Sequence, residues 1–431
     1  MTAAGGPPTV EAERLSALDP RDPRPLGARA AAGPRPGGLG PQVARNPSWM
    51  WRLPLADPAR KRTVHPSSSH AQPQAGRRIH YFQPTGYGGA YQHLMCVAGL
   101  LARAGVDVTV HTGHLPEPVG VEGVRVHRCC WWPWGGRAKT ALTRVRIAAR
   151  IATRTIPHLV RTLGRGDVLH VHGTQASAIT LAAIVAGRIS GARVVLSPHN
   201  TFSRLGVLDG ALLRAARLLS HALLVHSAAD VDRLRAESEN VSYAPLVQVA
   251  PRPGAESQRR WRERWDATNG ERVVLFAGSI RDDKRLDLLI ESARGWPAGW
   301  RLAVVGHDRG AWPAAERLAR LYGIDMRATI AWVDLDDFCA ALAAADVVVA
   351  PYERASQSGI LAIARQVGSR TVAADVGGLG ELASATFPPG DVEALTRTID
   401  AQLESGAEDA AAVDERTTVE AHLRAYSDDA A

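Results

Sequence analysis

Residues 346–381 constrain the fold more than any other part of the chain. Their sequence predicts a buried strand over 347–350, a loop of small residues, a helix over 360–367 and a second strand over 371–374. A strand, a helix and a second strand in this order form the crossover unit of a parallel sheet. At least one part of this chain is therefore expected to be an α/β domain.

The loop before this helix has the composition of an anion-binding site. Ser356, Ser358 and Gly359 lead directly into Ile360, the first residue of the predicted helix. The first N–H groups of a helix have no partner within the helix, and the helix dipole makes this end positive. We therefore expect these four residues to bind a phosphate group of a ligand.

A second crossover unit begins near residue 78. A predicted strand is followed by a turn that contains Gly86, Gly88 and Gly89, by a helix that ends at Gly105, and by another strand. Glycines at this position let a ligand approach the backbone near the helix N-terminus, which makes Gly88 and Gly89 candidate phosphate contacts. A purely structural turn explains them equally well.

Alternating strands and helices occur in two series. The first occupies residues 77–245 and the second residues 246–415, with a proline-containing linker over 241–257 between them. Residues 1–76 are predicted to form a low-complexity tail, and residues 416–431 a C-terminal tail. The chain is therefore predicted to be an α/β protein of two doubly wound Rossmann-like domains. Ligands of such sheets bind beyond the carboxyl ends of the strands, so the domains are expected to face each other across a cleft.

Charge is divided unequally between the two series. Residues 77–245 hold 20 basic and 9 acidic side chains, a net charge of +11, whereas residues 246–431 hold 21 and 29, a net charge of −8. This division argues against a nucleic-acid-binding protein and favours an anionic partner for the first domain. The arginine-rich segment 137–165 could lie on an anionic membrane surface or cover the sheet with a basic exposed face, and the sequence favours neither.

The four cysteines, Cys96, Cys129, Cys130 and Cys339, are not spaced as metal ligands. The adjacent pair could be redox partners or metal ligands, but no C-x-x-C motif or neighbouring histidine pair supports either role, and no metal site is predicted. The chain has no run of ~18 apolar residues, and its first residues show no apolar h-region, so no signal peptide is expected there. We therefore expect a cytoplasmic protein, in peripheral contact with the membrane if the basic segment binds lipid.

Cations and histidines follow predicted strands, where ligands of such sheets bind. Arg281 and Lys284 come after the first strand of the second series, and two cations there could neutralise a diphosphate leaving group. An exposed charged loop is the alternative, but Lys284 is one of only three lysines against 48 arginines. His172 ends a strand of the first series and His199 ends the next, so both are candidate site residues. His170 and His172 lie on the same face of their strand, and one of the two could instead be packed in the core.

Four motifs among these residues resemble the GT-B retaining glycosyltransferases of family 4, also called group 1. They are GG-x-x-x-H from Gly88, HVHG up to Gly173, AGS-x-x-x-x-K up to Lys284, and the block DVVVAPY…SQSGILAIA…DVGGLGE up to Glu381. The resemblance covers about residues 78–405, and the last block is its most specific part. It implies two facing Rossmann-like domains and a nucleotide diphosphate sugar as the donor.

The resemblance also implies roles for individual residues. His172 would contact the transferred sugar, Lys284 would contact the donor phosphates, and Glu381 matches the GG-x-x-E turn of the family. The arginine that accompanies the lysine in the family falls on Ser279, so Arg281 is expected to compensate from two residues further along.

The last block departs from the family pattern at two positions. The family usually has two glutamates eight positions apart, one for the sugar hydroxyls and one for the ribose, and Ala355 and Ile363 occupy these positions here. A subset of the family has Ser-Gln-Ser-Gly instead, as in residues 356–359. Glu353 is expected to substitute in part for the first of the two.

Together these features predict a glycosyltransferase of the hexosyltransferase type. It would move a sugar from a nucleotide diphosphate sugar to a glycan, lipid-linked or small-molecule acceptor, with retention at the anomeric carbon. No metal cofactor is expected, because cationic side chains would replace Mg²⁺ at the diphosphate. One alternative is a non-catalytic subunit that partners an active transferase, which the loss of both glutamates favours. The other is a nucleotide-sugar epimerase, which the same loss disfavours.

Overall fold

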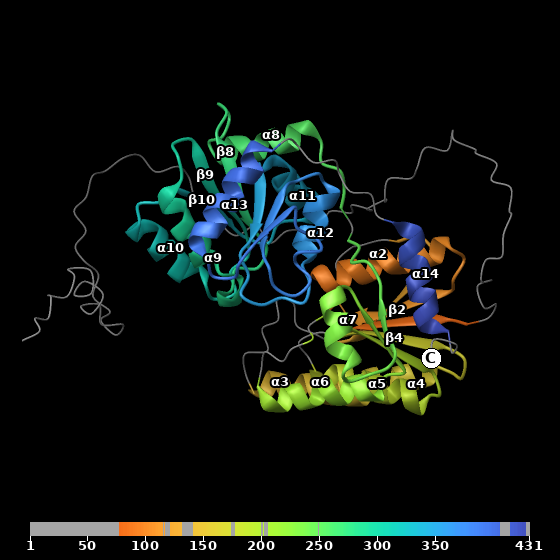
Figure 1. Cartoon of the computed structure of the whole chain (residues 1–431). Helices are drawn as coiled ribbons and strands as arrows, with labels where there is room; N and C mark the ends of the chain where they lie inside the picture. Colours follow the sequence, from red (N-terminus) through yellow and green to blue (C-terminus); the bar gives the residue numbers. More distant parts are fainter. Residues whose placement is uncertain are drawn as a thin grey trace, which may run out of the picture. The chain divides into compact units, whose positions relative to one another are not determined.

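The computed structural model describes residues 77–114, 116, 121–131, 141–173, 177–199, 201, 206–248, 250–405 and 414–427 (Figure 1). The predicted low-complexity tail, residues 1–76, lies outside these ranges. The described residues form two parallel sheets, each with helices on both faces. Two doubly wound Rossmann-like domains were predicted, and the structure confirms this fold class.

The first sheet has seven parallel strands in the order β3-β2-β1-β4-β5-β6-β7. Most of these strands are buried over nearly their whole length, as expected where both faces of a sheet are covered. The direction of strand addition reverses between β1 and β4, which is where ligands of such sheets bind. The strands are β1 (Ile79–Gln83), β2 (Val108–Gly113), β3 (Val124–Cys130), β4 (Val168–Gly173), β5 (Arg193–Pro198), β6 (Ala222–Val225) and β7 (Val241–Tyr243).

Helices cover both faces of this sheet. One face packs against α4 (Ile156–Thr162), α5 (Ser177–Ile189), α6 (Val207–Leu219) and α7 (Ala228–Arg235). The other face packs against α2 (Gly89–Arg103), which Figure 1 shows on the opposite side from α4, α5 and α6.

The described part of the arginine-rich segment, from residue 141 on, forms three consecutive pieces. These are α3 (Ala141–Arg150), a π-helical turn η2 (Ile151–Thr155) and α4, in which Pro157 is the second residue. The backbone stays helical through all three pieces, and Pro157, which has no N–H to donate, comes just after the π-helical turn, where the regular hydrogen-bond pattern changes. Ile147 and Ile151 are buried, whereas Leu142 and Val145 are exposed, so the segment presents apolar side chains to both the protein and the solvent.

The second sheet has six parallel strands in the order β10-β9-β8-β11-β12-β13, and its reversal lies between β8 and β11. One face packs against α9, α10 and α13, and the other against α8 and α11. Its strands are β8 (Arg272–Ala277), β9 (Trp300–Gly306), β10 (Met326–Ile330), β11 (Val347–Ala350), β12 (Thr371–Ala374) and β13 (Ala385–Phe387). Its helices are α8 (Ala255–Arg264), α9 (Leu286–Ser292), α10 (Trp312–Leu321), α11 (Leu335–Ala344), α12 (Gly359–Gln366) and α13 (Val392–Glu404), with short 3₁₀ turns η3 (Asp282–Lys284) and η4 (Ala293–Gly295).

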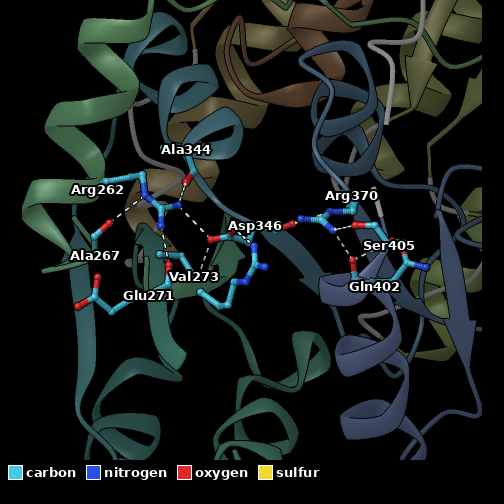
Figure 2. A network of polar contacts seen from close by, with 10 residues as sticks. Arg262, Ala267, Glu271, Val273, Ala344, Asp346, Arg370, Gln402 and Ser405 are labelled. Atoms are coloured by element: carbon cyan, nitrogen blue, oxygen red, sulfur yellow. Dashed lines mark hydrogen bonds and ion pairs between the residues drawn. The ribbon is translucent and has the colours of Figure 1, made fainter. Parts of the chain in front are cut away.

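An arginine–aspartate network joins the amino ends of these strands (Figure 2). Arg262 of α8 donates to the carboxylate of Asp346 at 3.0 Å and to three backbone carbonyls. Asp346 also accepts from the N–H of Val273 at 2.8 Å, and Arg370 donates to its carbonyl at 3.1 Å. The network fixes the starts of β8, β11 and β12 at the edge of the sheet opposite to their carboxyl ends.

The last described segment differs from the predicted C-terminal tail. Residues within 416–431 belong to α14 (Glu415–Tyr426), which packs beside α2 on the first sheet (Figure 1). Asp414 caps the helix by accepting from the N–H of Thr417. The hydroxyl of Tyr426 lies 2.6 Å from that of Tyr81 in β1. The chain therefore returns to its first sheet after completing the second.

Candidate functional site

The helix predicted after the small-residue loop is α12, which begins at Gly359, one residue before the predicted start. Ser358 is the N-cap residue, with an extended backbone, and its hydroxyl accepts from the N–H of Leu361 at 3.4 Å. Gly359 and Ile360 follow as the first residues of the helix, so their N–H groups point out of its positive end. This arrangement is suited to a phosphate group.

Two glycines bring the end of β8 against this helix start. A Cβ atom on Gly306 would overlap with the carbonyl of Gly278, and Gly278 itself has a φ of +106°, which favours glycine. A Cβ atom on Gly278 would lie 3.3 Å from the side chain of Ile360. The predicted residue Ser279 therefore directly follows a close contact between β8, β9 and α12.

Lys284 lies beside the same helix start through Tyr352. Its ammonium nitrogen is 3.3 Å from the centre of the Tyr352 ring, a cation–π contact. Tyr352 is buried two residues beyond the end of β11, and its hydroxyl lies close to the side chain of Ser358. Burial raises the pKa of Tyr352 to about 12, so the ring remains neutral at pH 7. The structure thus joins Lys284, Tyr352 and Ser358 in one array.

Arg281 is paired within its own loop. Its guanidinium donates two hydrogen bonds to the carboxylate of Asp283, at 2.9 and 3.2 Å. A phosphate would have to share this arginine with Asp283 or displace the carboxylate.

His172 and His199 form a chain that ends at the α12 loop. Nδ1 of His172 lies 2.9 Å from Nε2 of His199, and Nδ1 of His199 lies 2.7 Å from the amide nitrogen of Gln357. An amide nitrogen only donates, so His199 accepts at Nδ1 and donates from Nε2 to His172. The proton of His172 is then on Nε2, which is buried and has no hydrogen-bond partner among the described residues.

Burial keeps both rings neutral. It lowers the pKa of His199 to about 3 and the pKa of His172 well below its ordinary value. A neutral His172 with its proton on Nε2 is a hydrogen-bond donor without an acceptor in the described part of the chain, which suits a hydroxyl group of a ligand. His170, by contrast, is a satisfied core residue, bonded to Tyr426 at 2.8 Å and to Ser197 at 2.9 Å.

Gln248 lies between the two glycine-containing helix starts. Its side-chain nitrogen donates to the carbonyl of Gly89 at 3.1 Å, and a Cβ atom on Gly359 would lie 2.8 Å from the same nitrogen. Gly88, with a φ of +80°, is the N-cap residue of α2. The predicted phosphate contacts Gly88, Gly89 and Gly359 are thus brought together around one buried glutamine, whose Oε1 has no hydrogen-bond partner among the described residues.

Comparison with known families agrees with this geometry. Residues 87–243 match the family model described as "Glycosyltransferase Family 4", and residues 271–405 match the model described as "Glycosyl transferases group 1". The chain carries two glycosyltransferase domains. The predicted resemblance is confirmed at this level.

Individual relatives of these glycosyltransferase domains are similar over most of the chain. The D-inositol 3-phosphate glycosyltransferase of Xylanimonas cellulosilytica is 28% identical, over 68% of this chain and 76% of its own. The structure of HepE from Anabaena with UDP-glucose has a TM-score of 0.61 and 17% identity, over 81% of this chain and 93% of its own. The catalytic domain of starch synthase IV from Arabidopsis thaliana, bound to ADP and acarbose, has a TM-score of 0.59 and 14% identity, over 81% and 94%.

Ser356 and Glu381, two of the predicted donor contacts, form hydrogen bonds with other residues of the protein. The hydroxyl of Ser356 accepts from the N–H of Thr201 at 3.1 Å, and Thr201 in turn donates to Asp230. The carboxylate of Glu381 accepts from the N–H of Ala228 at 2.7 Å, at the start of α7. A carboxylate is favoured there by the positive end of the helix.

The positions of the two missing glutamates are both buried. Ala355 and Ile363 are 7% and 3% exposed, and Ile363 packs in the core beneath α12. Glu353, which was expected to substitute, is exposed, and its N–H donates to the carbonyl of Asp283. Its backbone therefore supports the loop of Arg281 and Lys284.

Two residues of the site, Gln357 and Gln248, were not predicted from the sequence. Both are neutral, and neither belongs to a pattern with a known chemistry apart from the Ser-Gln-Ser-Gly motif. That motif was the available signal for Gln357, and only the fold connects its side chain with His199. No sequence signal pointed to Gln248.

Proposed function

We propose that the protein transfers a glycosyl group from a nucleoside diphosphate sugar to an acceptor hydroxyl with retention of the anomeric configuration. The observation that carries this proposal is the convergence of two arrays on the start of α12. Lys284, Tyr352 and Ser358 reach it from one side, and His172, His199 and Gln357 from the other. One array suits the diphosphate and the other suits the sugar.

The cationic array would stabilise the leaving group. As the bond between the anomeric carbon and the phosphate oxygen breaks, negative charge grows on the diphosphate. The Lys284 ammonium and the N–H groups of Gly359 and Ile360 would stabilise that charge without a metal ion. The Nε2–H of His172 would donate to a hydroxyl of the donor sugar and hold its anomeric carbon against the acceptor.

An anionic acceptor is supported by the net charge of the first domain and by the name of a similar protein. Residues 77–245 carry the net charge of +11, and a 28% identical relative is named for an acceptor that bears a phosphate. We therefore favour a phosphorylated polyol or a phosphate-linked lipid over a neutral glycan.

We also propose that the arginine-rich segment contacts the anionic membrane surface peripherally. It carries exposed Leu142 and Val145, and no helix in the described ranges is long and apolar enough to cross a bilayer. Salt-sensitive binding to vesicles that contain anionic lipid would support this contact, and equal binding to neutral vesicles would contradict it.

The experiment that tests the proposed function combines binding with turnover. We expect one of UDP, GDP, ADP or TDP to raise the Tm of the wild type by mass action. Lys284→Ala is expected to lose most of this shift, while Arg320→Ala, an exposed cation of α10, should keep it. The nucleotide identified in this way then defines the sugar donors for assays of transfer.

Each outcome has a separate meaning. A shift without release of nucleotide from any cognate sugar donor and acceptor would favour the non-catalytic subunit, which the loss of both family glutamates also favours. The absence of any shift would contradict a diphosphate site at α12.

A further inference from the structure

A cluster of histidine and cysteine side chains lies on the first sheet, among residues that the glycosyl transfer does not use. His111 of β2, Cys129 of β3 and His158 of α4 each offer one ligand atom, and these three atoms lie within 4.8 Å of one another. Nδ1 of His111 is 3.1 Å from Nε2 of His158. Sequence reasoning found no histidine pair near the cysteines, because these residues are far apart along the chain.

The donor set and its spacing suit a tetrahedral zinc ion. With Zn–N bonds of about 2.0 Å and Zn–S bonds of about 2.3 Å, tetrahedral ligand atoms lie roughly 3.3–3.6 Å apart. The observed separation of the two histidine nitrogens is close to this. Two imidazoles and a thiolate are also ligands that Zn²⁺ prefers, whereas Mg²⁺ and Ca²⁺ prefer oxygen.

The surroundings of His111 support metal binding at its Nδ1. Its Nε2 lies 3.0 Å from Nδ1 of the buried His80, and Nε2 of His80 lies 3.8 Å from the carboxylate of Asp167. Asp167 is held in turn by Arg78, at 2.8 and 3.0 Å. A metal on Nδ1 of His111 would place the ring proton on Nε2, donated to His80.

His80 would then carry its own proton on Nε2, toward Asp167. That nitrogen is buried and has no hydrogen-bond partner among the described residues. A carboxylate behind a ligating histidine orients the ring and strengthens it as a ligand. Here the carboxylate is that of Asp167 and the ligating histidine is His111, and the imidazole of His80 lies between them.

We propose that His111, Cys129 and His158 bind one Zn²⁺ ion, which joins β2 and β3 to α4. Cys129 and His158 are only partly buried, so water can complete the tetrahedron from the open side. The buried Cys130, whose sulfur is 3.9 Å from that of Cys129, remains a core residue. The ion has a structural role, and the diphosphate site does not depend on it.

The test uses the full chain without a histidine tag, purified with no chelator. Elemental analysis is expected to find one zinc per chain in the wild type and in Cys96→Ser, a cysteine outside the cluster. Cys129→Ser and His158→Ala are expected to lose it. After chelation, added ZnCl₂ should raise the Tm of the wild type by about 5 °C and leave both variants unchanged.

A spectroscopic measurement on the wild type tests the site even if the variants fail to fold. Co²⁺ added to the chelated protein should give a sulfur-to-metal charge-transfer band and visible absorption typical of a tetrahedral ion. Retention of zinc in Cys130→Ser would agree with water as the fourth ligand. A wild type that binds neither zinc nor cobalt, or whose Tm responds to zinc as Cys129→Ser does, would overturn the proposal.

Discussion

Gln357 determines which nitrogen of His172 carries the proton. It does so at a distance, through His199, and its amide makes the whole chain of hydrogen bonds point toward His172. Sequence reasoning selected the two serines beside it because hydroxyls and glycine suit a phosphate. A neutral amide in a loop carries no such signal, so its role could be found only once the fold placed it against β5.

Replacing Gln357 with glutamate is therefore expected to reverse this chain. A carboxylate only accepts, so His199 would hold its proton on Nδ1 and accept at Nε2. His172 would then donate from Nδ1 to His199, and its Nε2 would carry no proton. We expect kcat/KM to fall about tenfold or more, the cost of one hydrogen bond to the sugar. Gln366→Glu makes the same change at the other end of α12 and should have little effect.

Nitrogen-15 chemical shifts of the imidazoles report the tautomers independently of turnover. In the wild type, Nε2 of His172 should be the protonated nitrogen, and in Gln357→Glu it should be Nδ1. An unchanged tautomer in the variant, or unchanged kinetics with a changed tautomer, would refute the role assigned to His172.

Asp346 is the second residue whose replacement has a defined expected effect. It is 14% exposed at its side chain and accepts from Arg262, Arg272 and the backbone of β8 (Figure 2). Asp346→Ala would leave Arg262 partly buried without its carboxylate, and we expect a loss of about 2 kcal/mol in the free energy of unfolding, allowing for partial solvent screening.

Urea unfolding of the purified protein measures this loss. Asp325→Ala, which removes a carboxylate 65% exposed and paired with Arg327, is the matched control and should change stability by less than about 1 kcal/mol. Equal effects of the two substitutions would mean that the network in Figure 2 adds little to the stability of the second domain.

Elements were predicted unequally well from the sequence. The strands 347–350 and 371–374 were placed correctly because short apolar runs between turn residues leave little choice in an α/β chain. Helix α14 was missed because its buried face is mostly small or polar, Thr418, Ala421, His422 and Ala425, with Tyr426 as its one large buried side chain. Such a face is recognisable only against the surface that it covers.

Tyr426 is expected to carry much of the attachment of α14. Its hydroxyl lies 2.6 Å from that of Tyr81 and 2.8 Å from Nδ1 of His170. Tyr426→Phe would leave both groups buried without this partner, which should cost about 1–3 kcal/mol. Tyr243→Phe, at an exposed tyrosine, should be neutral. Hydrogen exchange within α14 measures the loosening, and unchanged protection in the phenylalanine variant would contradict the role of the hydroxyl.

At the scale of the whole molecule, the glycosyltransferase concentrates buried histidines beneath the carboxyl ends of the first sheet. Rings from α2, β4, β5, the end of β6 and α14 lie within 4.5–6.0 Å of their neighbours. Sequence reasoning identified two of them by their positions at strand ends. His93 and His422 became visible as members only when α2 and α14 were folded onto the sheet, because a lone histidine in a helix gives no sign of its neighbours.

This cluster makes the stability of the protein depend on pH. Burial lowers the pKa of His93 to about 4 and the pKa values of His199 and His422 to about 3, from about 6.5 in the unfolded chain. The unfolded state therefore binds more protons below pH 6.5. The stability contributed by these neutral rings is fully present above that pH and is lost as the pH falls toward 3 to 4. Each ring adds a slope of up to about 1.4 kcal/mol per pH unit, so the free energy of unfolding in urea should fall steeply from pH 6.5 to 5.

His422→Gln removes one such group and should make the curve shallower, whereas His307→Gln, a less buried histidine of the second domain, should change the slope less. A flat profile over this range in the wild type would mean that the rings are charged or solvated in the native protein, and the donor role of neutral His172 would fail with it.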